Sequence, residues 1–266
     1  MNKKYLIIGN PVKHSLSPKI HNYWFEQCKI NSTYEKKEIL EHELKDVVDD
    51  IRKEKIFGAN VTVPYKEKII PFLDNLSKLS KKTNSVNTIY KKDNIVIGDN
   101  TDIFGFVESI KYNSISLKDK TALILGGGGV VPSIINGLNE LLIKKIFIMN
   151  RTFEKIKKFR ENYSNIELLE WGKPIEFDII INATSLGLQI EDEINLNLDN
   201  IKNEKIFYDT IYNPPKTNFL NKAEKNKHRT INGKLMLIYQ AQKSFQTWTN
   251  VMPNIDEKFL KFLSND

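Results

Sequence analysis

Short strand-like segments alternate with amphipathic segments along the first hundred residues of the chain. The strand-like segments are "KYLIIG", "STYEKKEI" and "GANVTV". Between them, apolar residues at helical spacing predict one helix from Ser17 or Pro18 to Cys28 and a second over 41–53. Ser17 is expected as the N-cap of the first helix, with Pro18 at its first helical position. The core face of that helix is then expected to hold Ile20, Tyr23, Trp24 and Cys28. The pattern predicts an α/β domain.

A second series of apolar runs begins at about Thr121. Its strands are expected at "TALIL", "IFIM", "FDIII" and "KIFYD", and helix-length segments separate them. Continuous apolar strands that alternate with helices are typical of a parallel sheet covered on both faces. The last long segment, "LMLIYQAQKSFQTW", has helical apolar spacing and follows a turn signal at Asn232 and Gly233. The sequence therefore predicts two α/β domains.

Composition narrows the classes of protein to consider. A chain of 266 residues with 40% apolar residues can bury one large core or two compact ones. Its single cysteine, Cys28, excludes an intramolecular disulfide, and the four histidines show no metal-ligand spacing, so we predict no metal. No apolar run has the length of a signal-peptide core or a membrane span. We expect a cytoplasmic protein without a membrane partner.

The net charge of +7 raises the question of a nucleic-acid partner. Lysines are interspersed with glutamates, as in "YEKKEILEHELKDVVDDIRKEK", and do not form a basic stripe with aromatic residues. This distribution indicates a compositional bias and a solvated surface. We therefore expect no nucleic-acid partner.

A glycine run lies between a predicted strand and a predicted helix in "TALILGGGGVVPSIINGL". At such a junction, backbone amides and the helix N-terminus can hold a pyrophosphate. Gly126 and Gly128 fit the first two positions of the G-x-G-x-x-G pattern, but Val131 occupies the third, so a simple flexible turn remains an alternative.

The end of the next strand, "FIMNRT", bears on the choice of dinucleotide. It lacks the acidic residue that usually binds the ribose 2′-hydroxyl of NAD. Asn150, Arg151 and Thr152, followed by Lys155, suit a ribose 2′-phosphate instead. NADP is therefore favoured over NAD, although a solvated arginine at a helix start remains an alternative.

Several further blocks carry a resemblance to a known family. In order they are "GNPVKHSLSPKIHN", "GANVTVPYKEKI", "SVNTIY", "GDNTDIFGF", "NRT", "NATSLG", "YDTIYNP" and "MLIYQAQKSF". Over nearly its whole length the chain resembles the shikimate dehydrogenases, in the free-standing form without a fused dehydroquinase region. The resemblance implies an N-terminal α/β substrate domain, residues 1–102 plus 236–266, and a Rossmann-like, doubly wound parallel-sheet NADP domain, residues 103–235.

The resemblance also implies a set of site residues. The expected catalytic residues are Lys66 and Asp102. The expected substrate-binding residues are Ser15, Ser17, Asn60, Thr62, Asn87, Tyr212 and Gln240. The expected cofactor-binding residues are Gly126, Gly127, Gly128, Gly129, Val130, Asn150, Arg151, Thr152, Lys155, Thr184, Thr210, Gly233 and Leu235. Taken singly, many of these residue types are equally typical of caps, strand ends and turns.

The implied reaction is the reversible NADPH-dependent reduction of 3-dehydroshikimate to shikimate, on the route to chorismate and aromatic amino acids. A lysine carries a proton at neutral pH, so Lys66 is suited to protonate the oxygen as hydride arrives, with Asp102 orienting it. The alternatives are an NAD-dependent quinate/shikimate dehydrogenase and a catalytically silent sensor of NADP and metabolite. We expect a monomer or a homodimer.

The chain departs from the family pattern around the cofactor. Branched residues and a proline, Val130, Val131 and Pro132, follow the paired glycines. Thr210 stands where methionine is frequent, and Leu235 where the family often has a second glycine. These departures predict weaker NADP binding more than weaker substrate binding.

Overall fold

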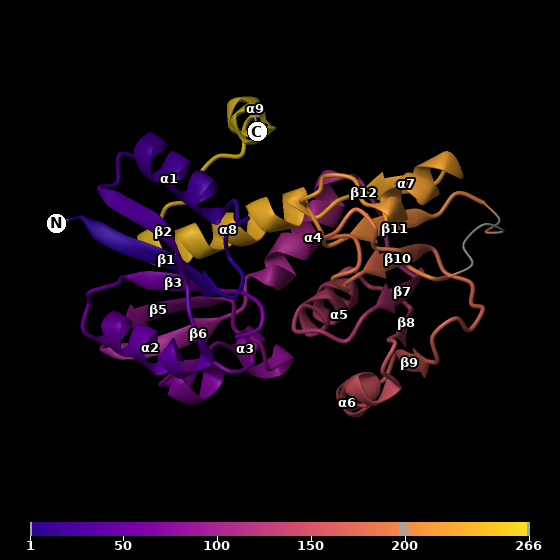
Figure 1. The fold of residues 1–266 in the computed structure, drawn as a ribbon, viewed down its shortest axis with the longest axis horizontal. Helices are drawn as coiled ribbons and strands as arrows, with labels where there is room; N and C mark the ends of the chain where they lie inside the picture. The colour runs from indigo at the N-terminus through magenta and orange to yellow at the C-terminus, as the bar shows by residue number, and fades with distance from the viewer. Residues whose placement is uncertain (1, 197–200, 202, 265–266) are drawn as a thin grey trace. The chain divides into compact units, whose positions relative to one another are not determined.

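The computed structural model describes residues 2–196, 201 and 203–264, and it divides into two compact units (Figure 1). Unit 1 comprises residues 1–105 and 238–266, and unit 2 comprises residues 106–237. The divisions fall inside two helices, α4 (Asp102–Tyr112) and α8 (Lys234–Thr249). The assignment of substrate binding to residues 1–102 plus 236–266 and of NADP binding to 103–235 stays a prediction.

Unit 1 contains a mixed sheet in the order β2-β1-β3-β5-β6-β4. Its strands are β1 (Lys3–Gly9), β2 (Ser32–Glu38), β3 (Gly58–Val61), β4 (Asn75–Leu76), β5 (Thr88–Lys92) and β6 (Ile95–Asp99). β1 pairs in parallel with β2 and β3, whereas β5 is antiparallel to both β3 and β6. The carboxyl ends of β1 and β3 therefore lie at the same edge of the sheet.

Alternating residues of β1 pack on opposite faces of this sheet. Leu6 and Ile8 join a core with the apolar face of α2 (Leu44–Arg52). Tyr5 instead stacks on Phe25 of α1 (Ser17–Gln27) and on Trp248 of α8. Figure 1 shows α1 and α2 on the two sides of the sheet. The remaining helical segments of unit 1 are η1 (Glu41–Glu43), η2 (Ile70–Phe72), α3 (Lys78–Thr83) and α9 (Glu257–Ser264).

The start of α1 differs from the prediction that Ser17 caps it. The N-cap is Leu16, which makes no side-chain cap, and Ser17 is already helical. Ser17 instead donates its N–H to the Ser15 hydroxyl at 3.2 Å, so a side chain two residues earlier satisfies this free amide. The prediction of Ser17 as N-cap was therefore wrong.

Three further expectations in unit 1 need correction. Ile20 and Trp24 are in the core, but Tyr23 and Cys28 are only partly buried, because they lie at the margin of the apolar face. The strand expected over "GANVTV" ends at Val61, shortly before Pro64, which has no N–H to offer a sheet. The helix expected over 41–53 begins as the 3-10 turn η1 and becomes α-helical at Leu44.

Unit 2 contains a wholly parallel sheet in the order β12-β11-β10-β7-β8-β9. Its strands are β7 (Thr121–Leu125), β8 (Lys145–Met149), β9 (Ile166–Leu169), β10 (Ile179–Asn182), β11 (Ile206–Asp209) and β12 (Arg229–Ile231). The chain starts at β7, winds outwards to β9, and then returns to β10 on the other side of β7. This is the doubly wound order of dinucleotide-binding folds, so the predicted fold class is confirmed.

Both faces of this sheet are covered, which explains its continuous apolar strands. Ala122 and Ile124 of β7 pack in one core with α5 (Val131–Glu140), while Leu123 and Leu125 pack in another with residues of α7 (Asn218–Lys225). The other helical segments of unit 2 are η3 (Phe153–Ile156) and α6 (Lys157–Asn162).

In the described part of the chain, no helix combines the length and apolar character needed to cross a membrane.

Candidate active site

Lys66 and Asp102 form an ion pair in unit 1. The Lys66 Nζ lies 2.5 Å from Asp102 Oδ2, and the two side chains are 13% and 7% exposed. Lys66 follows β3 by a short loop, and Asp102 is the first residue of α4. The second carboxylate oxygen, Oδ1, accepts a hydrogen bond of 2.8 Å from the Asn87 amide. Both oxygens are therefore engaged, and the orientation of the carboxylate is fixed.

Asn87 connects this pair to other predicted substrate-binding residues. Its Nδ2 lies 3.3 Å from Gln240 Oε1 on α8, and its Oδ1 accepts the N–H of Thr101 at 2.8 Å. Its backbone carbonyl accepts a 3.0 Å bond from Asn60 Nδ2. The structure thus brings together Lys66, Asp102, Asn87, Gln240 and Asn60 in one buried polar cluster.

The orientation of Asn60 is set by a residue that the sequence did not identify. The hydroxyl of Tyr34, on β2, donates to Asn60 Oδ1 at 2.7 Å. Tyr34 is buried in an otherwise largely exposed strand, "STYEKKE". Tyr34 is the one aromatic residue in this otherwise polar strand. Because successive side chains of a strand point to opposite faces, a lone aromatic residue of this kind is the sequence signal of a side chain that faces the core. Because the carbonyl oxygen of Asn60 is engaged by Tyr34, the amide nitrogen faces the cluster.

The predicted carboxylate-binding serines form a pair of their own. Ser15 Oγ donates to Ser17 Oγ at 3.2 Å, and Ser17 is buried. Thr62 lies against Gly9, where an added Cβ would be 2.4 Å from the Thr62 methyl. No hydrogen bond among the described residues joins Ser15, Ser17 or Thr62 directly to Lys66 or Asp102. Tyr212 belongs to unit 2, whereas the other predicted substrate-binding residues belong to unit 1.

The predicted cofactor-binding residues gather at one edge of the unit 2 sheet. Gly126, Asn150 and Thr210 directly follow β7, β8 and β11, and Thr184 lies two residues beyond β10. Since all these strands are parallel, their carboxyl ends meet at one edge. The order reverses between β7 and β10, and ligands of doubly wound sheets bind outside that switch point.

The glycine loop has room for a phosphate group. Gly126 has φ +122°, and a Cβ there would lie 2.7 Å from the Ala183 carbonyl oxygen, so only glycine fits without strain. A Cβ on Gly128 would meet nothing within 4 Å, which leaves space beside the start of α5. Val131 does not fill this space, because it is wholly buried in the core beneath the loop. The loop and the α5 N-terminus therefore fit a pyrophosphate.

The segment after β8 fits an additional phosphate. Arg151, Thr152 and Lys155 are exposed, and Asn150 Nδ2 holds the turn by donating to the Thr152 carbonyl at 2.7 Å. The nearby Glu154 carboxylate is paired with Lys157 at 2.7 Å. Within the described residues, the Arg151 guanidinium has no ion-pair partner. These groups fit the ribose 2′-phosphate of NADP.

The loops after β10 and β11 are held by Asn182, which the sequence did not single out. Its Oδ1 accepts the Thr184 hydroxyl at 2.7 Å, and its backbone oxygen accepts the Thr210 hydroxyl at 2.9 Å. Gly233 lies against Thr210, where an added Cβ would be 2.1 Å from the carbonyl oxygen. Asn182 thus joins the two loops on which Thr184 and Thr210 lie.

The remaining predicted cofactor-binding residues are Gly127, Gly129, Val130 and Leu235. The first three complete the glycine loop, and Leu235 lies partly exposed in the first turn of α8.

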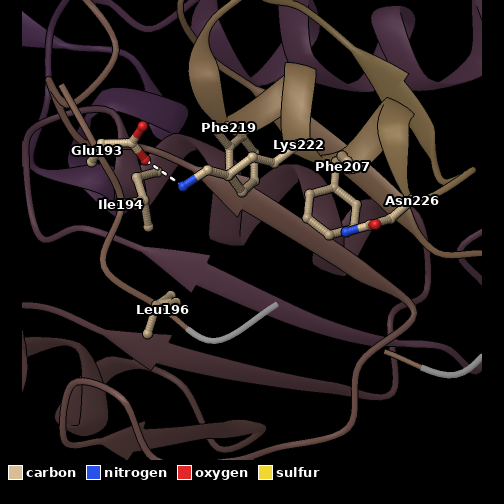
Figure 2. A pocket seen from close by; sticks show the side chains of 8 residues that line it. Glu193, Ile194, Leu196, Phe207, Phe219, Lys222 and Asn226 are labelled. Carbon is tan, nitrogen blue, oxygen red and sulfur yellow. Dashed lines mark hydrogen bonds and ion pairs between the residues drawn. The ribbon is translucent and has the colours of Figure 1, made fainter. Parts of the chain in front are cut away.

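A small cavity of about 70 Å³ lies elsewhere in unit 2 (Figure 2). Apolar side chains line it, including Ile194, Leu196, Phe207 and Phe219, and Lys222 forms an ion pair of 2.5 Å with Glu193 at its rim. None of the predicted site residues lines this cavity.

Among the described residues, no group of three or more His, Cys, Asp or Glu side chains is arranged to hold a metal ion.

Comparison with known families adds to this geometry. Residues 7–89 match the family described as the shikimate dehydrogenase substrate binding domain, and residues 108–231 match the family described as shikimate / quinate 5-dehydrogenase. The chain belongs to the shikimate dehydrogenase family. A relative named shikimate dehydrogenase (NADP(+)), from Pelagibacter ubique, is 54% identical over 263 residues, which is 99% of each chain.

Solved shikimate dehydrogenases share the fold. One, determined in complex with NADP+, has a TM-score of 0.92 and 33% identity, and the match covers 99% of this chain and 95% of that one. Another, from Listeria monocytogenes in complex with shikimate and NAD, has a TM-score of 0.89 and 29% identity, covering 98% and 96% of the two chains. The shikimate dehydrogenase fold therefore extends over essentially the whole chain.

Proposed function

We propose that this protein is an NADP-dependent shikimate dehydrogenase that reversibly reduces 3-dehydroshikimate to shikimate. The observation that carries the proposal is the shielded Lys66–Asp102 ion pair within a cluster of amide and hydroxyl groups. Ketone reduction needs a proton at the oxygen and hydrogen-bonding groups that orient a small polyol. This cluster supplies both kinds of group.

The proton comes from Lys66. Its ammonium group, held by Asp102 at 2.5 Å, donates a proton to the carbonyl oxygen of the substrate as that oxygen gains negative charge. In the oxidative direction the neutral amine takes the proton from the hydroxyl group. Because both side chains are largely shielded from water, the proton is not readily lost to solvent. NADPH, when bound, supplies the hydride.

The remaining substrate contacts follow from the same residues. Asn60, Thr62, Asn87 and Gln240 supply short donors and acceptors for the ring hydroxyl groups, with Asp102 accepting from one of them. Ser15 and Ser17 bind the carboxylate. Apart from Gln240, these side chains have few rotatable bonds, so little conformational entropy is lost when they hold the ligand.

The cofactor preference rests on the segment after β8. The glycine loop and the α5 N-terminus would hold the pyrophosphate of NADP, and Arg151 with Lys155 would hold the 2′-phosphate. An acidic residue, which would repel that phosphate, is absent from the end of β8 and the following Asn150-Arg151-Thr152. NADP is favoured over NAD for this reason.

We also infer a cytoplasmic location and a monomeric or homodimeric state. The free thiol of Cys28 suits a reducing compartment. Size-exclusion chromatography with light scattering, at several protein concentrations, measures the assembly directly.

The test is a matrix of initial rates with purified protein, in which shikimate and quinate are each combined with NADP and with NAD. We expect turnover confined largely to shikimate with NADP, and its loss in Lys66→Ala. Comparable rates with quinate and NAD would instead identify a quinate/shikimate dehydrogenase. No turnover, combined with binding of NADP and shikimate by calorimetry, would identify a sensor and contradict the proposal.

A further inference from the structure

Ser244 is a wholly buried serine of α8 at the centre of the polar cluster in unit 1. Its hydroxyl lies within hydrogen-bond distance of three side chains from three separate segments. They are Asn60 Nδ2 at 3.0 Å, Thr88 Oγ1 at 2.7 Å and Thr101 Oγ1 at 3.1 Å. One hydroxyl group therefore joins α8 to β3, to β5 and to the residue that precedes α4.

The donors and acceptors around Asn60 can be assigned. Its Oδ1 accepts from Tyr34, so its amide group must donate towards Ser244 and the Asn87 carbonyl. The Ser244 hydroxyl lies 3.0 Å from the Gln240 carbonyl in its own helix and can donate to it. Ser244 then accepts from Asn60, whose amide also lies 3.1 Å from Thr88 Oγ1. Removing the Ser244 oxygen takes away one of three acceptors around this buried amide and leaves it to re-orient towards Thr88 and the Asn87 carbonyl.

A second route leads from Ser244 to the ion pair. Thr101 lies 3.1 Å from Ser244 and can donate its hydroxyl proton to it, because the Ser244 proton is directed at the Gln240 carbonyl. The Thr101 hydroxyl oxygen then accepts from Asn87 Nδ2 at 2.9 Å, and the Thr101 N–H donates to Asn87 Oδ1 at 2.8 Å. Asn87 in turn donates to Asp102 Oδ1, and Asp102 holds Lys66. Three residues thus separate Ser244 from the proton-donating group. The intervening residues are, as whole residues, at most 5% exposed, and hydrogen bonds in such a dry setting reinforce one another.

We propose that Ser244 is a positioning residue for this site. By accepting from Asn60 and from Thr101, its hydroxyl oxygen fixes the Asn87 amide, and hence the Asp102 carboxylate, in the orientation that presents Lys66 to the substrate oxygen. The inference rests on the proposed dehydrogenase function. Small displacements of a proton donor lower turnover strongly, because the donor must lie within hydrogen-bond reach of the reacting atom.

The kinetic test compares Ser244→Ala with Ser80→Ala. Both serines are wholly buried in unit 1, but Ser80 Oγ has no hydrogen-bond partner among the described residues. Ser80→Ala therefore removes a buried hydroxyl group that orients no other side chain. We expect Ser244→Ala to lower kcat about 10- to 100-fold and to displace the pH profile of kcat, with KM for NADP unchanged. Ser80→Ala should retain wild-type kinetics. A lowered melting temperature in Ser244→Ala, with kcat per folded enzyme and pH profile unchanged, would overturn the proposal.

A measurement independent of turnover separates this inference from the proposed function. Side-chain amide NMR signals of Asn60 and Asn87 report their hydrogen bonding in the protein without substrate. We expect Ser244→Ala to shift both signals and to speed their hydrogen exchange, while Ser80→Ala leaves them in place. If wild-type protein shows no turnover, the proposed function fails but these signals still decide the role of Ser244. Unchanged signals in Ser244→Ala would refute it.

Discussion

The Lys66 ammonium group lies 2.5 Å from the Asp102 carboxylate, although 36 positions separate the two residues in the chain. Both side chains are largely shielded from water, so each charge depends on the other for its solvation. Removal of either one leaves a poorly hydrated, unpaired charge. The pair therefore acts as a unit, and kinetic effects of its two members should not add.

Replacement of Lys66 by alanine is expected to lower kcat by about 10²- to 10⁴-fold, the usual contribution of a positioned acid. Initial rates of shikimate oxidation and of 3-dehydroshikimate reduction measure this, with circular dichroism to check folding. Lys68→Ala is the matched control, because Lys68 is an exposed lysine two positions away that pairs with Glu41. Equal losses in both variants, or turnover retained in Lys66→Ala, would exclude Lys66 as the acid.

Replacement of Arg151 by alanine is expected to raise the Kd for NADP about 10- to 100-fold, because one or two charge-assisted hydrogen bonds to the 2′-phosphate are lost. The Kd for NAD should change little, since NAD has no such phosphate. Isothermal titration calorimetry with NADP and with NAD measures both constants. Arg160→Ala, a change at another exposed arginine nearby in the chain, should leave them unaltered. A similar loss of affinity for both cofactors would argue against recognition of the 2′-phosphate.

Gly128→Ala separates cofactor binding from folding. A methyl group at this position meets no protein atom within 4 Å, so the melting temperature without cofactor should stay the same. It would occupy the space offered to the pyrophosphate and weaken NADP binding at least about tenfold. Gly126→Ala, by contrast, should lower the melting temperature itself, because φ is +122° and the Ala183 carbonyl is too close. Tight NADP binding by Gly128→Ala would show that the cofactor does not approach this loop.

His21 is expected to lower the free energy of unfolding as the pH falls below about 6.5. Its imidazole is wholly buried and stacked on Tyr34 at 4.3 Å, and burial lowers its pKa to about 3. An unfolded histidine has a pKa of about 6.5, so below that pH protons bind the unfolded chain preferentially. The stabilisation is complete above pH 6.5 and falls, by about 1.4 kcal/mol per pH unit from this group alone, as the pH drops towards 3.

Urea unfolding between pH 4.5 and 7.5 measures this dependence. His21→Phe removes the titrating group and keeps the stacked ring, so the free energy of unfolding should fall less steeply with acid than in wild type. His42→Gln, at an exposed position, should retain the wild-type slope. Identical slopes in His21→Phe and wild type would contradict a buried, neutral His21.

The four inner strands of the unit 2 sheet, β7, β8, β10 and β11, were predictable because they are buried almost throughout and therefore read as unbroken apolar runs, in contrast to the partly exposed edge strands β9 and β12. The hairpin of β5 and β6 in unit 1 was not, since its strands are short, partly exposed and charged. Its turn, Asp93 and Asn94, has both residues at positive φ, which is a local signal for a tight hairpin. The N-cap error at Ser17 has a similar origin, because the choice between cap and first helical residue depends on the nearby Ser15 hydroxyl.

Within the candidate site, the sequence indicated charged and amide groups by their motifs, and their roles stay predictions. Nothing in the sequence distinguished Thr88, Thr101 or Ser244 as members of the buried hydrogen-bond cluster. Threonines at a strand start and before a helix are commonplace, and a serine inside a helix usually bonds only to its own backbone. Ser244 is 184 positions from Asn60, so only the fold could reveal that their side chains meet.

The division of the chain within α4 and α8 bears on how the protein is made. Synthesis from the N-terminus completes residues 106–237, all of unit 2, while unit 1 still lacks its last segment from Ile238 onwards. Domains tend to fold as they emerge, so the second unit can reach its native state before the first can. Until α8 leaves the ribosome, Asn60 and Thr88 lack the serine that joins them, and the β1 face lacks Trp248. A released chain that ends at Leu237 should therefore be protected from protease in unit 2 and cleaved in unit 1.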